Sequence, residues 1–425
     1  MRTFDYNKVR DPEYFRDGRM DAHSDHAYYA SEADMLEGSS KYVESLNGVW
    51  KFHYAKNYES AIPGFEKDDY SCRDWDDIRV PAHIQMEGYD IPQYANTQYP
   101  WEGREDIRPG DIPEHFNPTA SYVKYFTVPE QMKGKRLFIS FQGAESGIAV
   151  WLNGAFVGYS EDTFTPSEFE LTDYVKEGEN KLAAQVFKWT SSSWCEDQDF
   201  FRFSGIYRDV YLYTVPEVHI RDLRVRAIPD ETLTKGSLEI CTEAWGTGKA
   251  CFRLSYNGEV CFEEEKELTG TDTCTWEIPN PELWSAEEPK LYDLMIEVYN
   301  ADGTLCELIP EKVGFRRFEM KDHIMTLNGK RIVFKGVNRH EFSSISGRCV
   351  SEKELRKDLT VMKQNNINAI RTCHYPNTSL IYRLCDEYGL YMIDETNMES
   401  HGSWDTAHAT GDYDYIVPTN KPEWL

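Results

Sequence analysis

The sequence contains no long hydrophobic run and has few basic residues relative to its acidic ones. Its longest uninterrupted apolar stretch, residues 148–152, is far shorter than the ~20 residues that a membrane-spanning helix needs. Lys and Arg total 46 against 73 Asp and Glu, which gives a formal net charge of −27. Such a charge repels nucleic-acid phosphates and anionic lipids, so we expect the chain to bind neither nucleic acid nor a membrane.

Closely spaced cysteine pairs are also missing. The ten cysteines are scattered singly from Cys72 to Cys385, and none has the CxxC spacing of a zinc or redox site. We therefore expect reduced, mostly buried thiols. Residues 1–15 are charged throughout and lack the apolar segment of a signal peptide. Together these absences predict a cytoplasmic protein.

The composition favours a large, polar protein that is rich in aromatic rings. At roughly 150 residues per domain, a chain of 425 residues predicts three domains, each able to bury its own core. Aromatic residues make up 14% of this otherwise polar chain. That combination suits carbohydrate binding, because sugar C–H faces stack on rings while hydroxyl groups need polar partners. An aromatic-rich β core is the alternative interpretation.

Alternating apolar residues separated by turns indicate two consecutive β regions. Between residues 46 and 214 the alternation is typical of a jelly-roll β-sandwich, and Asn153-Gly154 has the signature of a two-residue hairpin turn. A second β region of immunoglobulin-like length follows, with its own hairpin signal at Asn257-Gly258. We place these two domains at residues 1–216 and 217–318.

The remaining residues, 319–425, alternate strands and helices. Apolar runs at 331–337, 368–373 and 390–393 predict three strands. Ser351 begins the first intervening helix with a capping box, and Gly389 ends the second. This order is that of a (β/α)8 TIM barrel, but a whole barrel takes about 250 residues, so we expect an incomplete barrel of about three units. The polar segment 403–425 is expected to be an interrupted loop.

Polar residues near the ends of predicted strands are the candidate functional groups. His340 and His374 each follow a predicted barrel strand, which places both at the barrel mouth. Residues 394–401 hold three carboxylates, an amide and an imidazole; they suit a hard cation such as Mg²⁺, although a solvated acidic loop has the same composition. Residues 194–199 combine aromatic and acidic side chains, which predict either a sugar or cation contact or an exposed loop.

Six motifs occur in order along the chain. They are 94–100 (YANTQYP), 196–209 (EDQDFFRFSGIYRD), 336–341 (GVNRHE), 362–366 (MKQNN), 371–376 (RTCHYP) and 394–402 (DETNMESHG). Together they resemble glycoside hydrolase family two, and specifically its long bacterial β-galactosidases. The resemblance implies the same three domains in the same order. It also implies that the sugar is bound by Asn96, Asp199, His340 and His374, that Asp199 touches Na⁺, and that Glu399 and His401 are ligands of Mg²⁺.

The activity implied by the resemblance is retaining hydrolysis of terminal non-reducing β-D-galactosides such as lactose, by an enzyme that is a homo-oligomer when complete. Such hydrolysis needs two carboxyl groups about 5 Å apart, one as nucleophile and one as acid/base. The family carries both glutamates on later barrel strands, the acid/base within an Asn-Glu-Ser type motif. No such motif occurs in this sequence, so we expect the chain alone to be inactive.

Two alternatives remain open. Within the family the competitor is β-glucuronidase, although an acidic Asp199 at the sugar and the net charge of −27 disfavour an anionic substrate. Outside enzymes, the chain would be a non-catalytic carbohydrate-binding or complementing polypeptide that uses its first domain.

Overall fold

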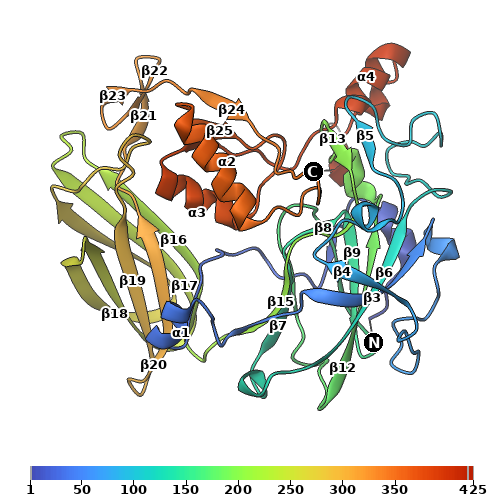
Figure 1. Cartoon of the computed structure of the whole chain (residues 1–425), viewed down its shortest axis with the longest axis horizontal. Helices are drawn as coiled ribbons and strands as arrows, with labels where there is room; N and C mark the ends of the chain where they lie inside the picture. Colours follow the sequence, from blue (N-terminus) through green and yellow to red (C-terminus); the bar gives the residue numbers. More distant parts are fainter. Residues whose placement is uncertain (1, 419–420, 425) are drawn as a thin grey trace.

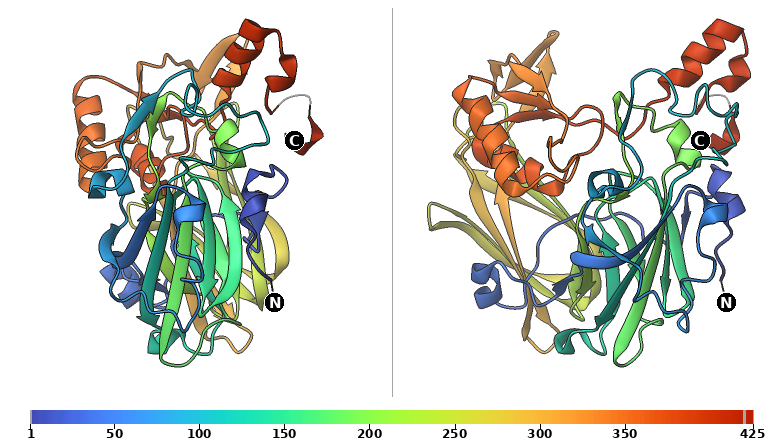
Figure 2. Two further views of the ribbon diagram at one scale, coloured as in Figure 1. Left: turned by 90° about the vertical axis from the view of Figure 1, so that its right-hand side faces the viewer. Right: turned by 45° about the vertical axis from the view of Figure 1, so that its right-hand side comes forward.

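The computed structural model describes residues 2–418 and 421–424. These residues fold into a first β-sandwich, a second β-sandwich and a small parallel sheet covered by helices. In Figure 1 the first sandwich lies on the right and the second on the left, with the parallel sheet between them at the top. The two views of Figure 2 show that the last α-helix stands over the first sandwich, apart from the two helices of the parallel sheet.

The first sandwich packs a seven-stranded sheet against a four-stranded sheet, with a core between them that includes Trp50, Ile139 and Leu182. The hairpin predicted at Asn153-Gly154 is confirmed, because both residues have the positive φ values, 52° and 84°, that its turn requires. The larger sheet has the order β1 (Arg16–Asp17), β10 (Ala155–Glu161), β9 (Gly147–Leu152), β12 (Glu179–Phe187), β6 (Thr119–Thr127), β3 (Gly48–Ala55), β4 (Asp76–Val80); the smaller has the order β11 (Ser167–Glu170), β7 (Leu137–Phe141), β15 (Val210–Thr214), β2 (Val43–Ser45).

Loops of the first sandwich form two further two-stranded ladders. One pairs β5 (Gln93–Ala95) with β13 (Phe200–Arg202), and the other pairs β8 (Ala144–Glu145) with β14 (Gly205–Ile206). The β5–β13 ladder carries candidate site residues at its end. The short helices of this part are α1 (Glu32–Glu37), η1 (Tyr6–Arg10), η2 (Tyr58–Ser60), η3 (Ile84–Glu87), η4 (Glu130–Met132) and η5 (Ser191–Trp194).

Two long strands, β17 (Lys235–Tyr256) and β18 (Glu259–Pro279), form the frame of the second sandwich. The hairpin predicted at Asn257-Gly258 joins them and is confirmed. β17 changes partner near Gly246: its first half pairs with β16 (His219–Pro229) and its second half with β19 (Tyr292–Asn300), which in turn pairs with β20 (Leu305–Val313). The apolar side chains of these strands form a separate core.

The third part is a sheet of three parallel strands in the order β24 (Gly336–Asn338), β25 (Ala369–Arg371) and β26 (Tyr391–Ile393). Helices α2 (Glu352–Gln364) and α3 (Ser379–Tyr388) connect them and pack together with Ile370 in one core. As predicted, Ser351 begins α2 with a capping box and Gly389 ends α3 in the left-handed conformation. A small antiparallel sheet precedes this part and contains β21 (Phe318–Lys321), β22 (Ile324–Leu327) and β23 (Lys330–Arg331).

Two predictions for this region are wrong. Residues 332–335 do not belong to the first parallel strand, because the side-chain amide of Asn368 bonds the Lys335 N–H at 2.7 Å and the Val333 carbonyl at 3.1 Å in place of a strand partner. The expected loop after residue 403 contains α4 (His401–Thr410), followed by η6 (Tyr413–Tyr415) and η7 (Pro422–Trp424). Only small residues of α4 are buried, so its sequence has no apolar stripe to reveal a helix.

All ten cysteines are free thiols. Four are buried, five are half-buried and Cys261 is exposed, so fewer are buried than the sequence led us to expect. No helix within the described ranges is both long enough and apolar enough to cross a membrane.

Candidate functional site

The carboxyl ends of the three parallel strands form the edge on which the candidate site is built. His340 follows β24, Cys373 and His374 follow β25, and Glu395 follows β26. Because the three strands are adjacent and parallel, residues that follow them meet at one edge of the sheet. We call this edge the strand mouth.

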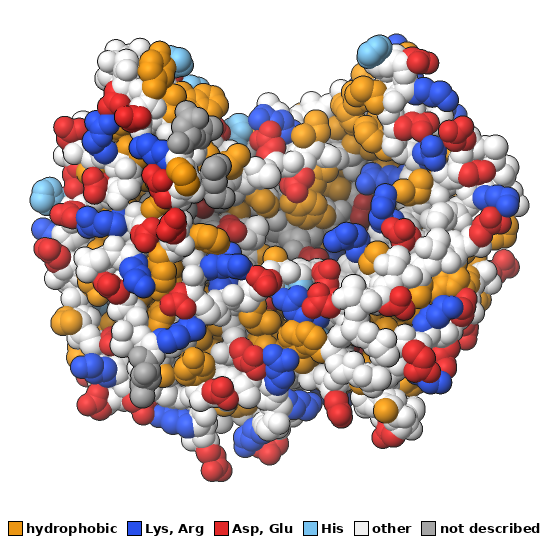
Figure 3. Space-filling model, turned by 180° about the vertical axis from the view of Figure 1, so that it is seen from behind, with side chains coloured by type: hydrophobic (Ala, Val, Ile, Leu, Met, Phe, Trp, Pro, Cys, Tyr) orange, Lys and Arg blue, Asp and Glu red, His pale blue; other side chains and the backbone are white. Residues whose placement is uncertain are grey.

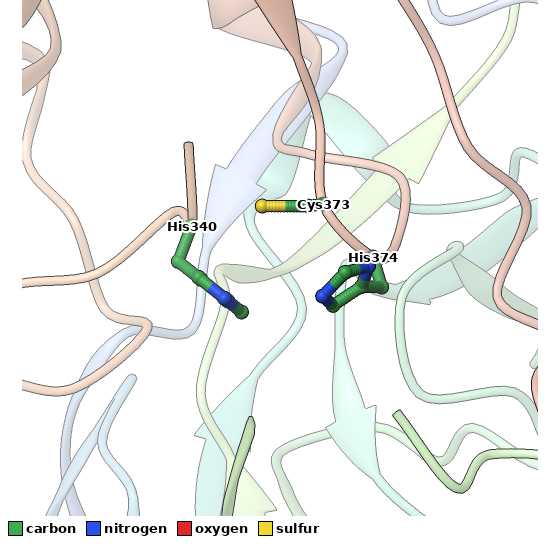
Figure 4. A group of neighbouring side chains, drawn as sticks. All are labelled: His340, Cys373 and His374. Atoms are coloured by element: carbon green, nitrogen blue, oxygen red, sulfur yellow. The ribbon is translucent and has the colours of Figure 1, made fainter. Parts of the chain in front are cut away.

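The imidazoles of His340 and His374 point toward each other at the strand mouth (Figure 4). Their ring centroids lie 5.4 Å apart and their planes are nearly perpendicular, at 79°. Burial lowers the pKa of His340, and the neighbouring His374 lowers it further. At neutral pH the ring of His340 is therefore uncharged, and it can donate one hydrogen bond and accept another.

Cys373 completes this group of side chains. One ligand atom from each of His340, Cys373 and His374 lies within 4.8 Å of the other two. The Cys373 side chain is buried, and burial raises the pKa of its thiol, while the positive charge of Arg371 acts in the opposite direction. The sequence analysis did not single out Cys373, because a lone cysteine beside a histidine has no recognisable spacing.

Glu395 is a second residue to which the sequence analysis gave no role. One of its carboxylate oxygens lies 3.5 Å from Nδ1 of His374, and the other accepts a 2.5 Å hydrogen bond from Nε of Arg371. The sequence did contain a signal for this contact. Glu395 lies two residues after the end of β26, and His374 lies three residues after the end of the adjacent strand β25. Glu395 therefore lies between Arg371 and His374.

Asn96 and Asp199 are brought together by the β5–β13 ladder of the first sandwich. In that antiparallel register Ala95 is opposite Phe200, so the next residues outward, Asn96 and Asp199, are opposite each other. The hydroxyl of Tyr94 donates a hydrogen bond to Oδ1 of Asp199. Tyr94 was also missed, although it shares a strand face with Asn96 through the period of two residues.

The carboxylate of Asp199 affects the pKa values of side chains at the strand mouth. Its negative charge raises the pKa values of both His340 and Cys373, opposing the lowering effect on His340 described above. The charge of Asp199, a residue of the first sandwich, is therefore felt at the strand mouth. The structure thus pairs the sequence-predicted residues in two groups, Asn96 opposite Asp199 and His340 facing His374, and the charge of Asp199 raises the pKa of His340.

Glu399 and His401 form a separate carboxylate–imidazole pair. Oε1 of Glu399 lies 3.8 Å from Nδ1 of His401, and Nε2 of the same ring lies 3.6 Å from Oδ2 of Asp405. Both side chains are partly exposed, and a carboxylate with access to water is the donor type that Mg²⁺ prefers. The pair can therefore supply two ligands to a hydrated divalent cation.

The first sandwich holds Glu399 in place through its backbone. Residues 195–197 run beside Glu399: its N–H donates to the Cys195 carbonyl at 2.7 Å, and the Asp197 N–H donates to the Glu399 carbonyl at 2.9 Å. The Asp197 carboxylate also accepts 2.9 Å hydrogen bonds from the N–H of Gly402 and from Arg202. These contacts position the segment that carries the predicted metal ligands.

Two buried carboxyl groups in the segment 195–197, which runs beside Glu399, have raised pKa values. Burial raises the pKa of Glu196 to about 8, and hydrogen bonds from Thr163 and Asn397 only partly offset that effect. Burial likewise raises the pKa of Asp197 to about 6, against the lowering effect of Arg202. Glu196 is therefore mostly protonated at neutral pH.

Buried contacts attach the strand mouth to the first sandwich. The ring of Phe164 stacks on Tyr375 at 4.1 Å between centroids. Arg208 of the sandwich donates a 2.9 Å hydrogen bond to Glu341, whose carboxylate also accepts from the Thr378 N–H at the start of α3. The two parts of the site are therefore held in fixed relation.

Apolar side chains gather in a hollow of the surface and around a cavity beside β26. Seen from behind, the molecule has a notch at its top between two projections, and hydrophobic side chains gather in the hollow below it (Figure 3). A cavity of about 800 Å³ lies where β26 faces the second sandwich, and its lining includes Trp284, Phe334 and Met392. The candidate sugar-binding residues do not line this cavity.

Three family descriptions match consecutive parts of the chain. "Glycosyl hydrolases family 2, sugar binding domain" matches residues 43–216, "Glycosyl hydrolases family 2" matches 218–316, and "Glycosyl hydrolases family 2, TIM barrel domain" matches 318–425. The described fold agrees with them: a sugar-binding sandwich, an immunoglobulin-like sandwich and the first units of a TIM barrel.

Curated relatives are β-galactosidases. The chain is 50% identical to one from Halalkalibacterium halodurans and 48% identical to one from Streptococcus thermophilus, in each case over 98% of this chain and 42% or 41% of the relative. It thus spans less than half the length of these two relatives. A β-galactosidase large subunit from Leuconostoc lactis is 43% identical over 97% of this chain and 68% of that subunit.

Solved structures with the same fold include other glycosidases. A Bacteroides uniformis β-glucuronidase superposes with a TM-score of 0.72 at 22% identity, covering 90% of this chain and 43% of its own. A Bacteroides vulgatus β-glycosidase superposes with a TM-score of 0.69 at 26% identity, covering 90% and 49%. At such identities the likeness establishes the architecture.

Proposed function

This chain belongs to glycosyl hydrolase family 2, and from that premise we propose that it is the sugar-binding front part of a β-galactosidase. The reaction of the whole enzyme is retaining hydrolysis of terminal β-D-galactosides such as lactose. The observation that supports this most directly is that His340 faces His374 at the strand mouth while the charge of Asp199, which lies opposite Asn96, raises the pKa of His340.

The four side chains suit a neutral sugar. The amide of Asn96 donates and accepts, the carboxylate of Asp199 accepts, and the two imidazoles each offer a donor and an acceptor when neutral, which together match the hydroxyl groups of one monosaccharide. We assign all four residues to hydrogen bonds with the galactosyl group.

The charges at the mouth argue against glucuronate. Asp199 and Glu395 are carboxylates, and the guanidinium of Arg371 is already engaged by Glu395 at 2.5 Å. Because Arg371 is already paired with Glu395, an anionic sugar would meet the negative charge of Asp199 without a free guanidinium to balance it. We propose galactoside over glucuronide as the substrate for this reason.

We assign neither catalytic carboxyl role to a residue of this chain. Retaining hydrolysis needs two carboxyl groups about 5 Å apart that are free to attack and to protonate. Glu395 is held by Arg371 and lies against His374, and Glu399 lies against His401. We therefore propose that the chain alone binds sugar without cleaving it.

We further propose that the site holds two cations. Glu399 and His401 would hold Mg²⁺, whose charge would compensate the acidic groups of the site, and Asp199 would contact Na⁺. Within the described residues, Asp199 receives a side-chain hydrogen bond from Tyr94 on Oδ1, which leaves Oδ2 for such a cation. The ten free thiols support a reducing, cytoplasmic location.

Isothermal titration of the purified chain with D-galactose and with D-glucuronate tests this function. We expect galactose to bind, glucuronate to bind at least about tenfold more weakly, and no hydrolysis of an aryl β-galactoside after host enzyme has been removed. Preferential binding of glucuronate would overturn the galactoside assignment. Hydrolysis by the chain alone would overturn the assignment of catalysis to residues outside it.

A further inference from the structure

The group formed by His340, Cys373 and His374 contains the donor set of a transition-metal site. Among the described residues it is the one group of three His, Cys, Asp or Glu side chains whose ligand atoms all lie within 4.8 Å of one another. Figure 4 shows the two imidazoles pointing toward each other with the sulfur to one side. We propose that these three side chains bind a thiophilic divalent cation such as Zn²⁺.

The donors are close to the separation that such an ion requires. Bonds of about 2.0–2.3 Å in a tetrahedral arrangement place neighbouring donor atoms roughly 3.3–3.6 Å apart. The donors here are within 4.8 Å, so they must approach by about 1 Å. Both histidines are partly exposed, and small rotations of their side chains supply that movement.

Hydrogen bonds hold the backbone around the group. The Thr372 N–H donates to the Ile393 carbonyl at 3.0 Å, and the Tyr375 N–H donates to the Thr372 carbonyl at 3.0 Å, which together define the turn that carries Cys373 and His374. The Arg339 N–H donates to the Arg371 carbonyl at 3.0 Å and so places His340 beside that turn. A site on such a framework loses little conformational entropy on binding.

The outer contacts of both imidazoles leave their inner nitrogens for a metal ion. Nδ1 of His374 faces Glu395 at 3.5 Å, and Nδ1 of His340 faces the Tyr375 hydroxyl at 3.5 Å. Metal-binding histidines commonly use one ring nitrogen for the ion and direct the other to a carboxylate or another oxygen. These contacts involve Nδ1 of both rings, so Nε2 of each ring is the nitrogen we assign to the ion, with Sγ of Cys373 as the third donor.

The donor chemistry selects the ion. Thiolate and imidazole favour Zn²⁺ or Co²⁺ over Mg²⁺ or Na⁺, which prefer oxygen ligands. On binding, the Cys373 thiol gives up its proton to solvent and the thiolate bonds the metal, while both imidazoles bind as neutral rings. Water completes the fourth position. This site is distinct from the pair Glu399 and His401, to which we assigned Mg²⁺.

The ion and the sugar would exclude each other. This step rests on the proposed function, because His340 and His374 are two of the residues assigned to the galactosyl group. An ion that binds both Nε2 atoms removes them from hydrogen bonding. Zn²⁺ would therefore act as a competitive, reversible inhibitor of galactose binding.

Cobalt binding to the full chain tests the site, since a Co²⁺–thiolate bond gives a charge-transfer absorption band that oxygen or nitrogen ligands alone do not give. We expect one Co²⁺ per chain with this band, its loss in Cys373→Ser, and at least about tenfold weaker Zn²⁺ binding by that variant in a calorimetric titration. Cys241→Ser, which removes a half-buried cysteine of the second sandwich, is the matched control and should behave as wild type. An unchanged band in Cys373→Ser, or its loss in the control, would overturn the site.

A second variant keeps the test decisive if Cys373→Ser does not fold. His340→Gln should retain the band and bind Zn²⁺ at least about tenfold more weakly; unchanged affinity would exclude His340 as a ligand. Galactose titrated into the Zn²⁺-loaded chain separates the two proposals. Displacement of the metal supports both, whereas a Cys373-dependent site that galactose does not affect leaves the metal site standing and counts against the sugar assignment.

Discussion

The backbones of Glu196 and Glu399 lie side by side in a parallel β-bridge, although one belongs to the first sandwich and the other follows the last strand of the parallel sheet. Two hydrogen bonds of 2.7 and 2.9 Å, involving Cys195 and Asp197, close this bridge. The position of a predicted metal ligand is therefore set by a different domain from the one that carries it. Changes in residues 195–197 should affect both stability and metal binding.

Replacement of Asp197 by alanine should strongly destabilise the chain. Asp197 and its partner Arg202 are both buried, so the substitution leaves an unpaired guanidinium in the interior and removes the acceptor of the Gly402 N–H. The expected loss is about 3–5 kcal/mol in the free energy of unfolding, measured by denaturant titration. Asp293→Ala, which removes an exposed partner of Lys312, is the control and should change little. A loss below about 1 kcal/mol for Asp197→Ala would contradict the buried pair.

The pKa of Glu196 predicts a stability that declines as pH rises. The folded chain holds the pKa at about 8 against an ordinary value of 4.5, so between these values the folded state binds more protons than the unfolded state. The contribution of Glu196 to the free energy of unfolding is therefore largest below pH 4.5. It decreases as the pH rises toward 8, by at most about 1.4 kcal/mol per pH unit.

Glu196→Gln isolates this effect, because the amide cannot ionise yet can still bond Thr163 and Asn397. Thermal unfolding of both proteins at pH 6 and pH 8 should show a smaller drop for the variant. Glu352→Gln, on the exposed face of α2, is the control and should follow wild type. Equal drops for wild type and Glu196→Gln would show that Glu196 is ionised in the folded chain.

Asp199→Asn should weaken galactose binding by roughly tenfold or more, because a charged acceptor for a sugar hydroxyl becomes a neutral amide. Tyr94→Phe should have a smaller effect, since its hydroxyl only holds Asp199 in place. Calorimetric titration with galactose measures both. Tyr413→Phe, which alters an exposed ring on η6, should bind as wild type does. Unaltered binding by Asp199→Asn would remove Asp199 from the sugar site.

Glu399→Gln should weaken Mg²⁺ binding by roughly tenfold or more, because the affinity of such sites depends on the number of charged oxygen ligands. Calorimetric titration of Mg²⁺ into the full chain measures this, with Glu352→Gln on the exposed face of α2 as a matched control that should leave Mg²⁺ binding unchanged. If Glu399→Gln bound Mg²⁺ as tightly as wild type, the ion would have to lie elsewhere.

Features set by neighbouring residues were predictable. The hairpins at Asn153-Gly154 and Asn257-Gly258, and the capping box at Ser351, depend on backbone preferences and contacts within a few residues. α4 was missed because its turns bury only Gly402, Ser403 and Ala407, so that no apolar period marks it. The shortness of β24 was missed because it depends on the distant side chain of Asn368.

The sequence by itself determined the family, the order of its three domains and the identity of the sugar-binding candidates, because ordered motifs and local periodicity are written in the chain. Only the tertiary structure decided which other residues contact the candidate site residues. Tyr94 reaches Asp199 through a strand pairing, Glu395 reaches His374 across adjacent parallel strands, and Glu399 is held by the first sandwich. Such contacts join residues far apart in the chain, and they form only when the burial of separate cores fixes the sheets and their junctions in space.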